Sequence, residues 1–226
     1  MRTHDIAASA QGSALIETTK MIRNTYMLLA MTLVFSTITA AISMMVNPPF
    51  MVYLGSMIGS FVMIFIINRM QNSVWALPLT FLFTGLMGFA LGPILNHYLA
   101  LPNGGDIVLT AMGMTALTFV GLSAYVLTSR KDFSFMGGFL AAGMIVVLVA
   151  IVASFLLPMF GVQISGLSLA ISGAVVLLMA GFILYDTSNI VNGTYTNYVM
   201  ATVSLYLNIY NLFVHLLHLV GVLSDD

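Results

Sequence analysis

The stretch ATVSLYLNIYNLFVHLLHLVGVL (residues 201–223) decides the fold class, because its 23 residues include no Asp, Glu, Lys or Arg. About 20 apolar residues in a helix are enough to cross the hydrocarbon core of a bilayer. Polar residues recur in this stretch at spacings of four, three, four and three, which places them on one helical face. We call this face the polar stripe; its members are Ser204, Asn208, Asn211, His215 and His218. Since lipid cannot hydrogen-bond to such a stripe, we expect it to line a watery cavity in a helix bundle, to bond to a neighbouring helix, or both.

The whole chain shares this apolar character. Its 226 residues are 60% hydrophobic and 6% charged, with a mean hydropathy of +1.07. About a quarter of an ordinary soluble domain is charged, and a soluble fold of this length lacks the interior to bury so much apolar surface. A net charge of −1 provides no basic surface for nucleic acid, and the lack of cysteine excludes disulfides from this chain. The composition therefore predicts an all-α, polytopic membrane protein.

Seven membrane spans can be read along the chain, separated by short polar or Pro/Gly-containing turns. They cover roughly residues 24–46, 50–68, 74–95, 107–128, 134–157, 164–190 and 198–222. With seven spans, every basic residue falls on one side of the membrane; these residues are Arg2, Lys20, Arg23, Arg69, Arg130 and Lys131. The positive-inside rule then predicts a cytoplasmic N-terminus and a C-terminus on the outer side, which is periplasmic in a bacterial cell. Residues 1–20 form a polar cytoplasmic tail in this scheme, and residues 21–226 form a single transmembrane domain.

Two pairs of glycines stand four residues apart within spans. Gly55 and Gly59 lie in the second span, and Gly88 and Gly92 lie in the third. Small residues at this spacing allow two helices to approach closely in lipid. We therefore expect both pairs to be packing positions within the bundle; the alternatives are a specific dimer contact and the general abundance of glycine in membrane helices.

Asp186, in the stretch ILYDTSNI (residues 183–190), is the only charged residue between Phe133 and Ser224. A carboxylate in a bilayer costs about 2.5–3.5 kcal/mol on insertion scales. Burial favours the neutral acid and a neighbouring cation favours the carboxylate, so a partner such as Arg69, at the end of the second span, would create a pH-sensitive latch. Asn208 lies at a similar depth if the last two spans form a hairpin. The alternative is a carboxylate near the membrane surface that hydrates the end of its helix.

Enzyme and metal readings find little support in the sequence. Gly166-Leu-Ser168-Leu-Ala170 is similar to an intramembrane serine-protease loop, for which His215 or His218 could act as the base. Such a match arises easily by chance in spans rich in Gly, Ser and Ala. His215 and His218 provide two ligands, whereas a catalytic zinc usually has three from the protein. The sequence thus predicts a protein that is not an enzyme, without catalytic residues, a metal site or a cofactor.

Four motifs together carry a family resemblance. They are GPILNHY (92–98), SRKDFSF (129–135), ILYDTSNI (183–190) and SLYLNIYNLFVHLL (204–217). With these motifs the chain resembles the Bax-inhibitor family, also called the transmembrane Bax inhibitor motif family, from Arg23 onward. The start of the first span and the short acidic tail are most similar to its bacterial YccA-like branch. The resemblance implies seven transmembrane helices, with the seventh central and six packed around it.

The family also suggests roles for three residues. In members that leak calcium, two aspartates on helices six and seven sense pH, and an arginine at the end of helix two latches onto the first aspartate. Asp186 and Arg69 match this pattern, but Asn208 stands where the second aspartate would be. An amide cannot share a proton as a carboxylate pair does, and it adds no charge to attract Ca²⁺. A pH-sensitive Ca²⁺ or H⁺ leak is therefore the alternative function.

The YccA-like branch implies a different function, which is our first hypothesis. Its members are similar in being partners and modulators of the membrane AAA protease FtsH and its associated membrane complex. The resemblance therefore implies an inner-membrane protein that acts in membrane-protein quality control as a slow substrate or competitor of FtsH. Residues 1–20 are polar and rich in small side chains, as expected of a disordered tail that such a protease grips.

Overall fold

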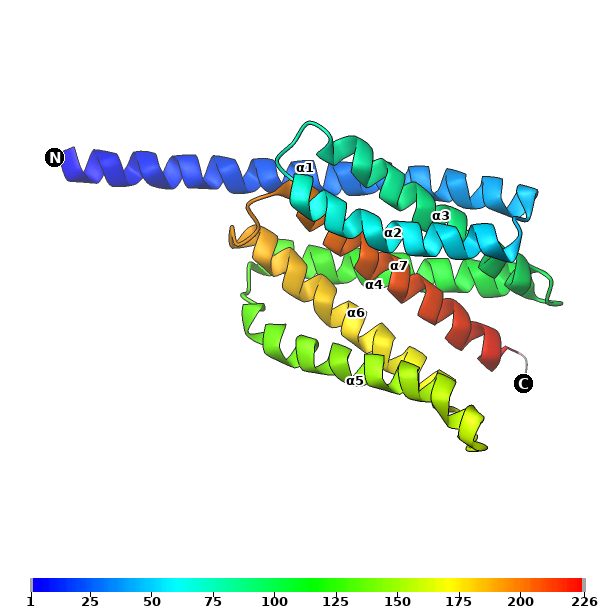
Figure 1. Cartoon of the computed structure of the whole chain (residues 1–226). Helices are drawn as coiled ribbons and strands as arrows, with labels where there is room; N and C mark the ends of the chain where they lie inside the picture. Colours follow the sequence, from blue (N-terminus) through cyan, green and yellow to red (C-terminus); the bar gives the residue numbers. More distant parts are fainter. Residues whose placement is uncertain (1, 225–226) are drawn as a thin grey trace. The chain divides into compact units, whose positions relative to one another are not determined.

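A computed structural model describes the backbone of residues 2–224, with side chains from Ile16 onward. Within this range the chain forms seven α-helices and no strand, and all seven are long and apolar enough to cross a membrane (Figure 1). The α-helices are α1 (Arg2–Val46), α2 (Phe50–Met70), α3 (Ala76–Leu99), α4 (Gly104–Ser129), α5 (Gly137–Leu156), α6 (Leu167–Val191) and α7 (Tyr198–Leu223). Two short 3₁₀ helices, η1 (Ser134–Met136) and η2 (Leu157–Phe160), flank α5. The predicted all-α membrane fold is confirmed, whereas the central position of the seventh helix stays a prediction.

The first helix differs from its predicted form. It begins at Arg2 and continues without a break to Val46, and the part apolar enough to cross a membrane starts at Ile16. Residues 2–20 are therefore helical, and the expectation that they are disordered is wrong. This segment contains one glycine, no proline and several good helix formers such as Ala, Leu and Glu, so nothing in it interrupts a helix. Its assignment as a cytoplasmic tail beside a single domain stays a prediction.

The contacts of the chain form two compact units. The first unit comprises Met1–Gly92 and Asn189–Tyr206, and therefore contains α1, α2, most of α3 and the beginning of α7. The second unit comprises Pro93–Ser188 and Leu207–Asp226, and contains α4, α5, nearly all of α6 and the remainder of α7. Each unit has its own packed interior.

Tyr206 is a buried residue of α7 that contacts α1 and α3 in the interior of the first unit. It is 1% exposed, and its hydroxyl lies 2.6 Å from Ser36 Oγ on α1 and donates to the carbonyl of Thr84 on α3. Its ring packs edge-on against Phe83, with 5.6 Å between the ring centroids. One turn earlier on α7, Thr202 donates a hydrogen bond to the carbonyl of Thr25 on α1. The first part of α7 is thus tied by polar contacts to two other helices of this unit.

Only one of the two predicted glycine pairs is a tight packing position. A Cβ atom on Gly88 would collide with the backbone carbonyl of Ser36, and one on Gly92 would collide with the Ser43 side chain, so α1 and α3 meet at these glycines. A Cβ atom on Gly59 would make an ordinary contact of 3.5 Å, and one on Gly55 would meet no atom within 4 Å. The packing prediction is therefore confirmed for the pair on α3.

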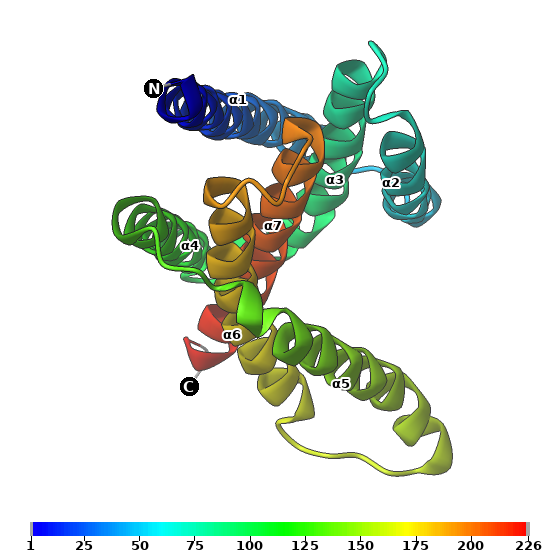
Figure 2. The same cartoon turned by 90° about the vertical axis from the view of Figure 1, so that its left-hand side faces the viewer.

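The second unit has a large apolar interior to which four helices contribute. Reciprocal contacts join α5 to α6: Leu178 lies over Gly143, and Leu140 lies over Gly181, each about where a glycine Cβ would stand. Figure 2 shows α5 lying beside α6. The fully and largely buried members of this core are Ile107, Ala111, Leu140, Val147, Ile171, Val175, Leu178, Met179, Ile183, Leu212, Leu216 and Leu217.

We predict that Gly88→Ala lowers the free energy of unfolding by about 1–3 kcal/mol, because the added methyl group forces α1 and α3 apart. Gly55→Ala is the matched control, since the same methyl group meets open space there. Reversible unfolding of the detergent-solubilised protein with a denaturing detergent would measure both variants. Equal losses of stability in the two variants would contradict the packing geometry.

Candidate functional site

Asp186 lies near the C-terminal end of α6, inside the second unit. Its side chain is 2% exposed, and the next two residues, Thr187 and Ser188, are completely buried. Successive residues of a helix point in different directions, so three buried polar residues in a row indicate protein on several sides of α6. Buried polar groups require hydrogen-bond partners, and these three find theirs on different elements.

Asp186 is paired with Asn208. The amide Nδ2 of Asn208, on α7, donates to Asp186 Oδ2 over 2.6 Å, and Asn208 is 6% exposed. This contact favours the reading of Asp186 as a buried carboxyl over that of a hydrated group at the helix end. A neutral amide satisfies the carboxyl without adding a charge.

The two residues after Asp186 connect α6 to other parts of the unit. Thr187 Oγ1 lies 3.5 Å from Ser123 Oγ on α4. Ser188 Oγ accepts a hydrogen bond of 2.8 Å from the backbone N–H of Phe133, in the loop between α4 and η1, and donates to Asp132 in the same loop. The stretch 186–188 therefore joins α6 to α7, α4 and this loop. Sequence reasoning did not assign roles to Thr187 and Ser188, although an unbroken polar run inside a span is a visible signal.

Arg69, the predicted latch, lies in the last turn of α2 in the first unit, with an exposed side chain. Asp186 belongs to the second unit. An ion pair between them stays a prediction, as does any role of Asp186, Asn208 and Arg69 in sensing pH.

The polar stripe of α7 has several kinds of partner. Asn208 bonds to Asp186, whereas Asn211 donates to the carbonyl of Leu207 in its own helix. Further along, Nδ1 of His215 and Nδ1 of His218 lie 3.1 Å and 3.0 Å from Ser172 Oγ on α6. Ser204, the first member, is partly buried in the first unit. Three members of the stripe thus bond to α6. Bonding to a neighbouring helix was one of the two environments that the sequence predicted for this stripe.

The histidines therefore meet Ser172 rather than Ser168, the serine of the protease-like stretch. Ser172 lies about one turn further along α6 and is 4% exposed. Among the residues whose side chains are described, there is no group of three or more His, Cys, Asp or Glu arranged to hold a metal ion. The arrangement is that of a small hydrogen-bonded cluster within the bundle.

Comparison with known proteins gives consistent matches over nearly the whole chain. A family model described as "Inhibitor of apoptosis-promoting Bax1" matches residues 18–225. An uncharacterized protein of Pseudomonas aeruginosa is 49% identical over 93% of this chain and 92% of its own length. A protein of Escherichia coli K12 named "Modulator of FtsH protease YccA" is 44% identical over 98% of both chains. A protein of Escherichia coli O6:H1 named "Inner membrane protein YccA" matches with the same identity and coverage.

We predict that Asn208→Leu lowers the free energy of unfolding by about 1–3 kcal/mol, because it removes a donor from a buried carboxyl group. Asn211→Leu is the same chemical change on the same helix, but its amide donates to a carbonyl that the helix already employs. This control should lose less stability in the same unfolding titration. A loss from Asn211→Leu as large as that from Asn208→Leu would show that the contact with Asp186 contributes nothing specific.

Proposed function

This chain belongs to the Bax-inhibitor family, and from that premise we propose that it is an inner-membrane protein that modulates an FtsH-type membrane AAA protease. The observation that carries the proposal is the 44% identity, over 98% of both chains, to the Escherichia coli protein named as a modulator of FtsH protease. Similarity along the full length means that the relative has no large additional segment that could account for its named activity. The name of a second relative as an inner membrane protein supports the location.

The proposed mechanism is occupancy of the protease. An AAA protease that extracts a membrane protein must pull apart its interior, and polar contacts buried among helices resist this step. The chain has such contacts in both units, at Tyr206 with Ser36 and at Asn208 with Asp186. A substrate that is bound quickly and extracted slowly would keep the protease from other membrane proteins. In this proposal the chain acts as a slow substrate or competitor rather than as an enzyme.

The N-terminal part of α1 is the proposed handle for the protease. Figure 1 shows it extending beyond α2 and α3, which belong to the same unit. Helical segments without tertiary packing are marginally stable in water, so an engaged protease could unwind this one easily. The positive-inside rule supports a cytoplasmic position, because Lys20 and Arg23 lie at the start of the first span and Arg69 lies at the end of the second. A periplasmic C-terminus follows from an odd number of spans.

A degradation assay with purified FtsH and a membrane reporter substrate tests this proposal. We predict that the full-length chain slows degradation of the reporter, and that removal of residues 2–15 abolishes the effect because the handle is lost. A variant with residues 2–15 in scrambled order is the control, since it preserves length and composition. It should compete as the original does if the protease grips any N-terminal segment of this length and composition.

Two results would contradict different parts of the proposal. If the full-length chain leaves reporter degradation unchanged, the chain does not modulate this protease. If the truncated chain competes as well as the full-length chain, modulation stands but the handle lies elsewhere.

The buried carboxyl group of Asp186 supports a second candidate, a pH-sensitive leak for Ca²⁺ or H⁺ with Arg69 as the latch. An ionisable group inside a membrane span is expensive and commonly marks an ion path. Asp186 is 2% exposed and bonded to α7, so a change in its protonation would act on a contact between helices. Asn208 removes the second carboxylate that a Ca²⁺ site would favour, which makes this the weaker candidate.

Ion flux in proteoliposomes tests the second candidate. We predict that, if the chain is a leak, Asp186→Asn removes the pH dependence of Ca²⁺ or H⁺ flux, because position 186 can no longer ionise. Asp106→Asn is the matched control, since Asp106 is an exposed carboxylate in the first turn of α4. If the wild-type protein conducts no ions whereas the Asn208→Asp variant does, the amide at position 208 disables the leak. The leak would then be rejected as the function of this chain.

A further inference from the structure

Ser172 is the meeting point of two histidines in the second unit. Its Oγ atom lies 3.1 Å from Nδ1 of His215 and 3.0 Å from Nδ1 of His218. The serine is 4% exposed, and both histidines are partly buried. The two rings stand three residues apart on α7 and both turn toward the same hydroxyl on α6. The function proposed above leaves this cluster without a role.

The hydrogen-bonding capacity of the cluster fixes the direction of its bonds. A serine hydroxyl has one proton to donate and two lone pairs with which to accept. Among the described residues, Ser172 has no hydrogen-bond partner other than the two imidazoles. Its proton must therefore go to Nδ1 of one ring, and Nδ1 of the other ring must carry a proton and donate to Oγ. The neutral cluster is a directed chain, Nδ1–H···Oγ–H···Nδ1, with the two histidines in opposite tautomers.

We propose that His215, Ser172 and His218 form a proton relay. A proton binds to the free Nε2 of the ring that carries its proton on Nδ1, and that ring passes its Nδ1 proton to Ser172 Oγ. The hydroxyl gives its original proton to Nδ1 of the second ring, which releases the proton on its own Nε2. One proton enters and one leaves, the serine is regenerated, and the two rings have exchanged tautomers. Reorientation of the rings or passage in the reverse direction restores the starting state.

The chemistry of the three side chains favours a relay over a metal site or a nucleophile. Imidazole is the side chain that gains and loses protons near neutral pH, and it can do so at two separate atoms. Two histidines and one serine fall short of the three protein ligands usual for catalytic zinc, and the described side chains provide no larger group. A nucleophilic serine requires room for a substrate at its oxygen, whereas Ser172 is buried beneath the two rings.

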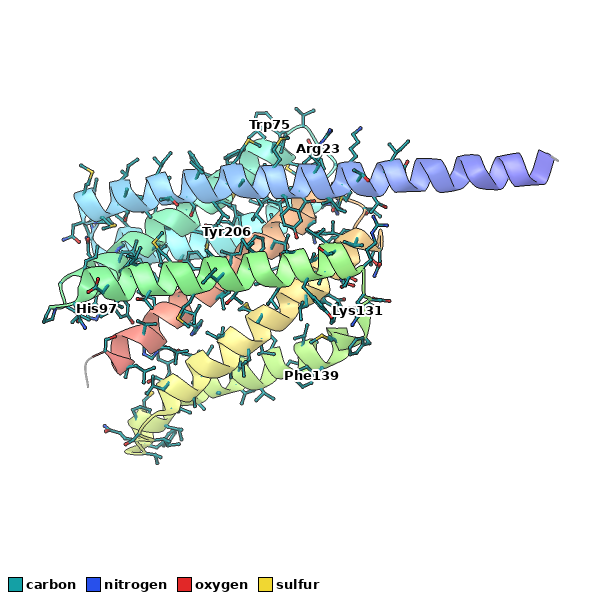
Figure 3. All side chains as sticks on the ribbon, turned by 180° about the vertical axis from the view of Figure 1, so that it is seen from behind. Arg23, Trp75, His97, Lys131, Phe139 and Tyr206 are labelled. Carbon is teal, nitrogen blue, oxygen red and sulfur yellow. The ribbon has the colours of Figure 1, made fainter. Side chains whose placement is uncertain are left out.

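The described ionisable side chains on the neighbouring helices of this unit can be placed element by element. The ring of Tyr98, at the end of α3, lies against Gly221, three residues beyond His218, and His97 packs edge-on against Tyr98. On α4, Asp106 is exposed in the first turn, and α5 has no ionisable side chain. Figure 3 shows Lys131 just beyond one end of α4 and His97 near the other end of that helix. The phenol ring of Tyr98, with the imidazole of His97 beside it, is thus adjacent to the turn of α7 that follows His218.

The relay is separate from the contact between Asp186 and Asn208. Ser172 precedes Asp186 by 14 residues on the same helix, which corresponds to about 21 Å along the helix axis. The two clusters can therefore be tested independently by substitution.

Nitrogen-15 NMR of histidine-labelled, full-length protein in lipid nanodiscs tests the tautomers directly. We expect one of the two rings to carry its proton on Nδ1 and the other on Nε2, with peaks assigned by His215→Gln and His218→Gln. Ser172→Ala should abolish this complementary pattern, whereas Ser172→Thr should retain it because the hydroxyl remains. The same tautomer in both rings of the wild-type protein would overturn the proposal, as would a pattern unaffected by Ser172→Ala.

Proton flux into proteoliposomes under an imposed pH gradient tests the transfer itself. We expect flux through the wild-type protein and Ser172→Thr, and a fall to the rate of protein-free vesicles in Ser172→Ala. Ser154→Ala is the matched control, because Ser154 bonds to the carbonyl of Ile151 in its own helix. Wild-type flux equal to that of protein-free vesicles, or full flux through Ser172→Ala, would overturn the relay. Since FtsH is absent from both assays, their outcome is independent of protease modulation.

Discussion

The absence of water from the bilayer core is the constraint on which this structure depends. Every polar group within a span must be satisfied by the protein, because lipid offers neither donors nor acceptors. Most of the described buried side chains meet this requirement in one of two ways, whereas Thr25 Oγ1 and Ser43 Oγ on α1 are buried without a hydrogen-bond partner. Many hydroxyl groups bond to a carbonyl of their own helix, as Thr80 does to Ala76 and Thr115 does to Ala111. Such bonds satisfy the side chain but do not select which helices pack against each other.

The smaller set of bonds that cross between helices gives each unit its specific arrangement. In the first unit, Tyr206 joins α7 to α1 and α3. In the second, Asn208 joins α7 to the end of α6, and two histidines join it to the beginning of α6. The apolar contacts around them are less selective, because a leucine packs against lipid as readily as against protein. Within each unit, the polar residues of α6 and α7 therefore favour particular partner helices and a particular register.

The parts of this structure that depend on local sequence pattern could be predicted from the sequence. Hydropathy gave the seven spans, and helical spacing placed the stripe from Ser204 to His218 on one face. The partners of these residues were harder to find, because nothing near Ser172 in the sequence distinguishes it from Ser168. The glycine pairs illustrate the same limit. Gly55 and Gly88 begin identical motifs, yet only at Gly88 would a Cβ atom collide with another helix, since the arrangement of neighbouring helices decides whether a small residue is needed.

The amide at position 208 distinguishes the two proposed functions, because it can bond to Asp186 in either protonation state. Asn208 can donate through its nitrogen to an ionised Asp186, and it can accept through its oxygen from a protonated one. The contact between α6 and α7 therefore survives either state of the carboxyl group, whereas two facing carboxylates would repel each other once both had lost their protons. A contact that persists across pH is poorly matched to a gate that must open. It is well matched to a protein whose proposed effect on a protease depends on resisting extraction, so the chemistry of this one pair favours modulation over a leak gated by Asp186.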